Sequence, residues 1–319
     1  MKNNVNILIA HDFSDCSTQA LNYGIEFAIE NQATLHFLYV DVQYQAPGSP
    51  VVSGHPDAVE LREKLITSID NSFAELGFSI EDIPEIKFAV QRHIAAAPAI
   101  VTYCSDHKID LVVLGTHGRR GLTRKLLGSV AEEVVRLAPC TVFTVQEELP
   151  FKPLITRLHA VAVPFDFSDH AHKALLFAKE VAATFGATMD VIHVIEEHLH
   201  NTFYREGIAG VYDSGVNLEE KVKTALATIV SELPGDPVPV ALSVLTGHPV
   251  KQTISWLQKQ AHNLAVVSTT GHIGLERAML GSVAERIVRL APCPVFTFKP
   301  IQLPRSNSVA RQAPEKNLL

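Results

Sequence analysis

The feature that most constrains the fold of this 319-residue chain is a long internal repeat. The segment Gly118–Val145 returns as Gly271–Phe298, with 19 of 28 aligned positions identical. A second match lies at the start of each half, where Ile9–Asp15 corresponds to Val163–Asp169. The two offsets are 153 and 154 residues. A period of this length exceeds that of any solenoid unit and indicates a duplicated domain.

We therefore expect two domains of similar size, as the usual domain length also suggests. Residues 1–147 are predicted to form the first domain, residues 156–300 the second and residues 301–319 a flexible tail without hydrophobic periodicity. The short stretch between the domains contains Pro150 and Pro153, as a linker often does. Hydrophobic residues make up 47% of the chain, which is enough for two packed cores.

Composition also excludes several classes of protein. The net charge of −7 does not favour binding to nucleic acid or to an anionic membrane surface. The apolar run near the N-terminus, Asn6–Ala10, is much shorter than a signal-peptide core or the ~20 residues of a membrane span. The four cysteines form no CxxC pair. We expect a cytoplasmic protein with buried thiols, and neither nucleic acid nor membrane as a partner.

Each half alternates strand-like apolar runs with segments of helical periodicity. This pattern predicts an α/β fold of two tandem doubly wound domains, each a five-stranded parallel sheet with about four helices. The expected strands of the first half are Asn6–Ala10, Thr34–Val40, Ile86–Val90, Leu111–Leu114 and Thr141–Val145. Those of the second half are Ala160–Pro164, Val191–Ile195, Val240–Leu245, Leu264–Val267 and Val295–Phe298.

A candidate phosphate site follows the fourth expected strand of the first half. The sequence there is Gly115-Thr116-His117-Gly118, and after nine further residues Gly128-Ser129 begins a helix. Glycines let backbone amides approach an anion, and a helix N-terminus offers free N–H groups. Isolated glycines also serve turns and N-caps, but the repetition of this spacing favours an anion site. The intervening Arg119, Arg120, Arg124 and Lys125 either add positive charge or form a solvated loop face.

The spacing Gly-x2-Gly-x9-Gly-Ser resembles the motif of ATP-binding members of the universal stress protein family. The start Asp12-Phe13-Ser14 and the ending Leu-Ala-Pro-Cys-x-Val-Phe also resemble that family, so the resemblance spans nearly the whole chain. It implies a Rossmann-like fold of the adenine nucleotide alpha hydrolase type. It also implies that the last strands of the two halves pair about a pseudo-two-fold axis, as an intramolecular pseudo-dimer, with a further homodimer left open.

The resemblance further implies a stress-response module that senses or signals by binding ATP, with or without Mg²⁺, chiefly in the first domain. The residues expected around this nucleotide are Ala10, His11, Asp12, Val40, Gly115, His117, Gly118, Gly128, Ser129 and Val130. Their counterparts in the second domain are Asp166, Val194, Gly271, Gly281, Ser282 and Val283. In that domain Ser268 replaces the first glycine and Thr270 replaces the histidine, which argues against binding there.

Motifs of other nucleotide-dependent and hydrolytic enzymes are missing from the sequence. It contains no GxxxxGK[ST] loop, no Gly-x-Gly-x-x-Gly after the first strand and no Gly-x-Ser-x-Gly elbow. The spacing of His193, His198 and His200 matches no zinc signature, so no metal site is assigned. We assign no catalytic residue and expect at most weak ATP hydrolysis. The alternative function is a nucleotide-free scaffold or interaction protein of the same fold.

Overall fold

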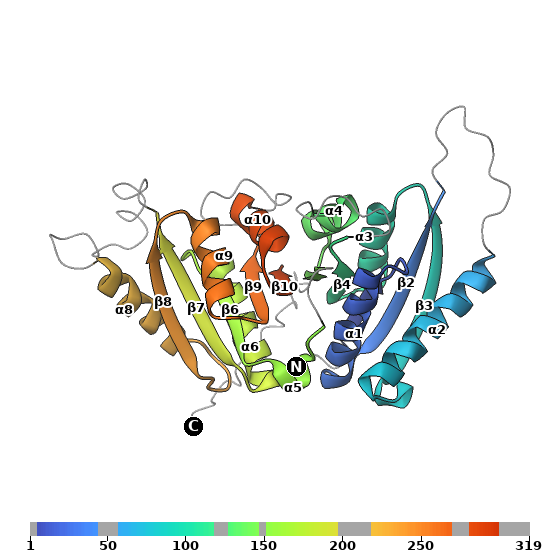
Figure 1. Cartoon of the computed structure of the whole chain (residues 1–319), viewed down its shortest axis with the longest axis horizontal. Coiled ribbons are helices and arrows are strands. Elements are labelled where there is room, and N and C mark those ends of the chain that lie inside the picture. The colour runs from blue at the N-terminus through green and yellow to red at the C-terminus, as the bar shows by residue number, and fades with distance from the viewer. Residues whose placement is uncertain are drawn as a thin grey trace, which may run out of the picture.

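The two halves of the chain build one continuous sheet (Figure 1). The structure is a computed structural model that describes residues 5–43, 57–117, 127–146, 151–196, 218–269 and 281–299. Its ten strands lie in the order β3-β2-β1-β4-β5-β10-β9-β6-β7-β8. Neighbouring strands are parallel within each half and antiparallel where β5 meets β10. The predicted α/β class, with two doubly wound five-stranded halves, is confirmed.

The elements follow the predicted order in both halves. The strands are β1 Asn6–Ala10, β2 Thr34–Val42, β3 Glu85–His93, β4 Leu111–Gly115, β5 Thr141–Val145, β6 Ala160–Pro164, β7 Thr188–Ile195, β8 Val240–Thr246, β9 Leu264–Ser268 and β10 Val295–Phe298. The helices are α1 Asp15–Glu30, α2 Ala58–Leu76, α3 Ala96–Asp106, α4 Ser129–Leu137, α5 Leu154–Arg157, α6 Asp169–Phe185, α8 Leu218–Ser231, α9 Pro249–Lys259 and α10 Ser282–Leu290. A 3₁₀ turn, Ile80–Asp82, precedes β3.

The outer strands are longer than their hydrophobic pattern indicates. Strand β3 pairs with β2 from Glu85 to His93, although both of these end residues are exposed. Strands β1 and β4 lie in the middle of the first half and have fully buried central residues. They therefore read as continuous apolar runs, as expected of parallel strands covered on both faces.

Two cores lie on opposite faces of the sheet. One contains buried residues of α1, α2, α6 and α8, and the other contains buried residues of α3, α4, α9 and α10. The four cysteines are buried and free, as their spacing predicts. Among the helices of the described residues, none is both long enough and apolar enough to cross a bilayer.

The seam between the halves is the antiparallel pairing of β5 with β10. Phe143 lies opposite Phe296, with their ring centroids 4.7 Å apart. Phe27 of α1 packs on both rings, at 5.0 and 5.2 Å, and Phe177 of α6 packs on Phe296 at 5.2 Å. The pairing of the two last strands, predicted from the family resemblance, is therefore present within one chain.

Reciprocal hydrogen bonds across the seam add to this pairing. Lys299, which follows β10, donates from Nζ to the carbonyl oxygens of Arg136 and Ala138 at the end of α4, at 3.0 and 2.7 Å. Gln146 follows β5 and donates from Nε2 to the carbonyl oxygen of Val288 in α10, at 3.2 Å. Each half thus satisfies carbonyl groups near the C-terminus of a helix of the other half.

The linker is held against α1 by two buried side chains. The Tyr23 hydroxyl accepts a hydrogen bond from Lys152 N at 3.2 Å, and Glu26 Oε2 accepts one from Leu154 N at 2.9 Å. Burial raises the pKa of Glu26 to about 7. The matching residue of the second half, Glu180, is exposed on α6. The clamp on the linker is therefore specific to the first half.

We predict that Phe296→Ala destabilises the whole chain, because it leaves a cavity where rings of both halves meet. The expected loss in the free energy of unfolding is about 3–5 kcal/mol, measured by urea denaturation. Val59→Ala, at a 60% exposed position on α2, is the control and should change little. A loss below ~1 kcal/mol for Phe296→Ala would show that the seam contributes little to stability.

A second prediction concerns pH. The folded chain retains the Glu26 proton up to about pH 7, whereas an unfolded chain releases it near pH 4.5. Stability from this group is therefore present at low pH and is lost as the pH rises from about 4.5 to 7. Glu26→Gln removes this loss, so the stability of the variant relative to the wild type should rise by about 1–3 kcal/mol across this window. Thermal unfolding at several pH values measures it, and a pH-independent difference would contradict it.

Candidate functional site

The order of the strands reverses between β1 and β4, and this reversal defines the candidate site. Ala10, the last residue of β1, lies between Leu38 of β2 and Leu114 of β4. The chain runs outward from β1 through β2 to β3 and returns to β4. In such sheets the carboxyl ends on either side of the reversal diverge and leave a crevice for ligands. The predicted residues around Asp12 and Gly115 follow these two strand ends.

A tight turn follows β1 and starts α1. Asp12 Oδ1 accepts hydrogen bonds from Ser14 N at 3.1 Å and from Ser14 Oγ at 2.6 Å. Ser14 is the N-cap of α1 and accepts from Ser17 N. Phe13, between them, has a φ of 64°, which is unusual for a residue with a side chain. The turn is thus held in a strained conformation by the residues on both sides of it.

The second half builds the same turn. Asp166 Oδ1 accepts from Ser168 N at 3.0 Å, and Ser168 caps α6 by accepting from Ala171 N. Phe167 has the same φ of 64° as Phe13. The sequence match at the start of the two halves therefore encodes one local geometry.

The N-terminus of α4 points its amides at the same edge. Gly128 is the N-cap of α4 and provides no side-chain hydrogen bond to the helix. The amides of the first turn therefore lack a capping group from the N-cap residue. Gly128 N donates to Thr116 O at 2.8 Å, and a Cβ at residue 128 would lie 2.7 Å from that oxygen. We call this backbone contact the Thr116–Gly128 clasp, and only glycine fits it.

The second half repeats the clasp, since Gly281 N donates to Thr269 O at 2.6 Å. Gly281 is the N-cap of α10, again without a side-chain hydrogen bond. Ser129 and Ser282, the first residues of the two helices, are exposed. Val130 and Val283 are 38% and 39% exposed. The two helix N-termini are therefore equivalent in geometry.

Gly115 is required for a different reason from the one that its place in the motif suggests. A Cβ at residue 115 would lie 2.6 Å from Cys16 Sγ and 3.0 Å from the Cys16 carbonyl carbon. The glycine therefore allows α1 to pack against the end of β4, and this requirement holds with or without a bound ligand. In the second half Ser268 takes this place and His170 takes that of Cys16. The change from glycine to serine thus accompanies a change in the packed helix.

Three predicted residues lie on the same face of the sheet as α4. Ala10 and Val40 are half-buried and pack against the core that contains α3 and α4, and Val194 does so in the second half.

His117 Nδ1 shares a 3.0 Å hydrogen bond with Thr116 Oγ1. His117 Nε2 is buried and has no hydrogen-bond partner within the described residues. This orphaned nitrogen is a polar group to which a ligand can bind.

His11 is placed differently from Ala10. Its ring is buried and packs on Phe13 and Phe37, each at a centroid distance of 5.2 Å, and these residues belong to the α1–α2 core. Its backbone N donates to Leu38 O at 2.9 Å. The His11 side chain therefore does not share a face with Ala10, Val40 and α4. The remaining predicted residues, Gly118, Gly271 and the basic arc of Arg119, Arg120, Arg124 and Lys125, lie outside the described residues.

Comparison with known proteins identifies the architecture. A model of the universal stress protein family matches the chain twice, at residues 4–146 and 158–299. The chain belongs to this family. It is a tandem member, because both halves match.

Relatives of known name support this assignment. A universal stress protein of Methanocaldococcus jannaschii is 31% identical over 139 residues, which cover 44% of this chain and 81% of the relative. One of Mycobacterium bovis is 29% identical over 218 residues, which cover 67% of this chain and 70% of the relative. The crystal structure of a universal stress protein from Archaeoglobus fulgidus matches 92% of this chain and 98% of its own, at 19% identity and a TM-score of 0.60, and shows the same fold.

The two universal stress protein repeats differ at Pro164, a proline at the end of a central strand. In the first repeat β1 pairs with β4 over four positions, from Ile7 to Ala10, whereas β6 pairs with β9 only at Val161 and Ala162. Phe165 N donates to Ile192 O of β7, on the side away from β9. His11 N likewise donates to Leu38 O of β2, on the side away from β4. Residues alternate in direction along a parallel strand, so the amide of residue 164 would point at β9. Pro164 has no N–H, which explains why the ladder ends.

We predict that exchanging alanine and proline between positions 10 and 164 shortens the β1–β4 ladder and extends the β6–β9 ladder. Ala10→Pro should remove a hydrogen bond between β1 and β4 and destabilise the first repeat by about 1–3 kcal/mol. Pro164→Ala supplies the missing donor, so its new amide should be protected in hydrogen exchange by NMR. An unprotected amide at residue 164 would show that the proline is not what ends the β6–β9 ladder.

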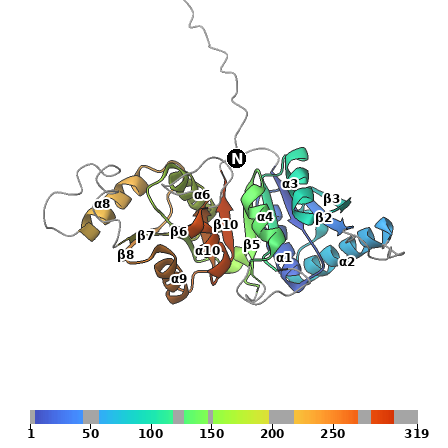
Figure 2. The same cartoon turned by 90° about the horizontal axis from the view of Figure 1, so that it is seen from above.

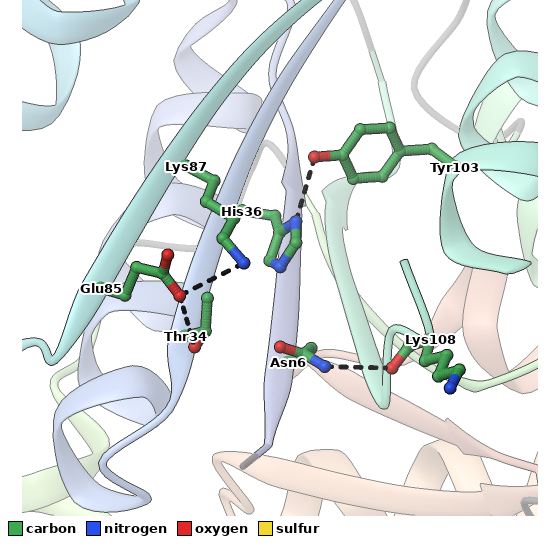
Figure 3. A network of polar contacts seen from close by, with 7 residues as sticks. All are labelled: Asn6, Thr34, His36, Glu85, Lys87, Tyr103 and Lys108. Atoms are coloured by element: carbon green, nitrogen blue, oxygen red, sulfur yellow. Dashed lines mark hydrogen bonds and ion pairs between the residues drawn. The ribbon is translucent and has the colours of Figure 1, made fainter. Parts of the chain in front are cut away.

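Polar side chains also gather near the amino ends of the strands of the first repeat, opposite the crevice (Figure 3). His36 Nδ1 and the Tyr103 hydroxyl share a 3.0 Å hydrogen bond, and Glu85 contacts Lys87 at 3.2 Å. Burial is the main reason why the pKa of His36 is lowered to about 4. In the second repeat Asp190 and His262 form a 2.9 Å contact in this region. These clusters lie under α3 and α9, at the other end of the strands from the crevice. They leave His36 Nε2, Asp190 Oδ1 and His262 Nδ1 buried without a hydrogen-bond partner within the described residues.

Proposed function

We propose that this universal stress protein binds one adenine nucleotide, ATP, at the carboxyl edge of its first repeat, as a cytoplasmic sensing or signalling module in stress response. The observation that carries the proposal is the N-terminus of α4, where the N-cap residue Gly128 provides no side-chain hydrogen bond to the helix. The Thr116–Gly128 clasp holds this end beside the reversal between β1 and β4. We also propose that residues 1–147 form the first domain, which holds the nucleotide, and residues 156–300 the second.

The phosphates are assigned to the N-terminus of α4. The amides of its first turn and its dipole favour an anion, and the exposed Ser129 hydroxyl adds a donor at the same end. His117 Nε2, which has no partner within the described residues, supplies a further polar contact near the clasp. A chain of net charge −7 needs such a local site to hold a polyanion.

The base is assigned to the apolar surface at the ends of β1 and β2. Ala10 and Val40 are half-buried on the face of the sheet that α4 also covers. A flat aromatic base is well suited to such a surface, because pockets for small molecules are mostly apolar with a few polar groups that set orientation. Asp12 is the carboxylate of the predicted site that a Mg²⁺ ion accompanying ATP would use, although its Oδ1 already accepts two hydrogen bonds from Ser14.

The first repeat is favoured over the second by two differences at equivalent places. Pro164 replaces Ala10, and Thr270 replaces His117. The second repeat keeps its Asp166 turn and its clasp. It therefore retains the anion-binding end of the site but has a shorter β6–β9 ladder, and so a different crevice. The nucleotide-free scaffold is the alternative function.

We predict that Ser129→Pro weakens ATP binding by about 10–100-fold, because it removes one amide donor and one hydroxyl from the anion site. Proline is favoured at the first position of a helix, and Gly128, with φ −60° and ψ 143°, has a conformation allowed before proline. The helix should therefore stay intact. Isothermal titration calorimetry of ATP into the purified chain measures both affinity and stoichiometry.

Ser282→Pro is the matched control, since it makes the same change at α10. It should leave one ATP per chain bound with unchanged affinity, and Ser129→Ala separates the hydroxyl from the amide. If Ser282→Pro weakens binding instead, the nucleotide lies in the second repeat. If the wild type binds no nucleotide, the ATP proposal is wrong and the scaffold function stands.

A further inference from the structure

The two repeats present matched surfaces of opposite charge. Helices α4 and α10 flank the β5–β10 seam in both views (Figures 1 and 2). Leu137 near the end of α4 and Leu290 near the end of α10 are each 40% exposed. Between these leucines and the helix starts, Glu133 of α4 corresponds to Arg286 of α10. A surface that is apolar and acidic in one repeat is thus apolar and basic in the other.

The difference in charge extends to the neighbouring helices. Helices α9 and α10 together carry four Lys or Arg residues and one Glu, whereas α3 and α4 carry three Asp or Glu residues and one Arg. Lys251 of α9 corresponds to Pro98 of α3. Within the part of the chain that the structure describes, no ion pair involves Glu133, Arg286 or Lys251. Within the described residues these charges are therefore available to a partner.

The basic surface is hollowed into a groove between α9 and α10. The groove has a volume of about 670 Å³ and contains no carboxylate among its lining residues. Three of these residues are apolar and three are Lys or Arg; the lining residues used here are Val250, Ile254 and Leu290, and Lys251, Arg286 and Arg289. Arg289 Nε is buried without a hydrogen-bond partner within the described residues. Such a lining fits a ridge that is both apolar and acidic.

We propose that this groove binds the α4 surface of a second copy of the chain, with Glu133 opposite Arg286 and Leu137 against the apolar lining. A small inorganic anion would use the cations and leave the apolar residues exposed. The α4 surface uses both, and it is present at the same concentration as the groove. The contact covers exposed Leu137 and Leu290, which a monomer leaves in water. It is independent of the proposed ATP site and is tested without nucleotide.

The test is a charge exchange followed by sedimentation velocity at low salt. We expect the wild type to self-associate, and Glu133→Arg or Arg286→Glu alone to weaken association at least about tenfold, because each single change opposes like charges. The double variant, and an equimolar mixture of the two single variants, should associate like the wild type. Both restore a pair of opposite charges at the contact, and added salt should weaken all of these complexes.

Glu63→Arg is the matched control, because it makes the same change of charge at an exposed position of α2, on the other face of the sheet. It should leave association unchanged. A wild type that stays monomeric to ~100 µM overturns the proposal, since the free energy of association would then be weaker than about −5.5 kcal/mol. So does a double variant no better than the single ones. If the monomeric chain instead binds a synthetic acidic amphipathic peptide at the groove, the occupant is a different protein.

Discussion

The antiparallel pairing of β5 with β10 is the contact on which the rest of this structure depends. It joins two five-stranded sheets into one and covers an edge strand of each half that would otherwise expose unpaired backbone groups. Phe143 and Phe296 add a shared aromatic core, and Lys299 and Gln146 each reach a helix of the other repeat. The two repeats are therefore one folded body, and a substitution at the seam alters the packing of both repeats.

The two repeats share their strand order but differ in sequence and local structure at a few positions. The turns at Asp12 and Asp166, with a positive φ at the next residue, are the same in both. Among the differences are Pro164, where the ladder between β6 and β9 is shorter, and α9 and α10, where the groove is lined by basic residues. The two copies therefore share their turns at the carboxyl edge but differ at the end of a central strand and on the surface of two helices.

Much of the fold could be predicted from the sequence, because the repeat and the alternation of strand and helix patterns are strong signals. Strands β1, β5, β6 and β10 have the predicted bounds. Both ends of β3 and the last residue of β8, Thr246, were missed because exposed polar residues there pair through the backbone alone, which leaves no hydrophobic pattern. The antiparallel seam was predicted only through the family resemblance, since no local pattern encodes which strands of two domains meet.

For the candidate site, the sequence predicts which residues gather at one edge but not why each is needed. Gly115 was interpreted as making room for a ligand, whereas the structure shows that Cys16 occupies the space of its missing Cβ. His11 is next to Ala10 in the sequence, yet its ring packs in the opposite core. Pro164 carried a readable signal, a proline at the end of a central strand, and its effect became clear only once the direction of each amide was known.

The Thr116–Gly128 clasp has a consequence for how such a protein can change. It ties together the two ends of the segment 117–127 by a backbone contact that uses no side chain, and Thr269 and Gly281 do the same for residues 270–280. Substitutions inside either segment leave the start of the following helix where it is. The sequence of the segment can therefore vary while the helix N-terminus stays fixed, and the two segments of this chain already differ at six of eleven positions.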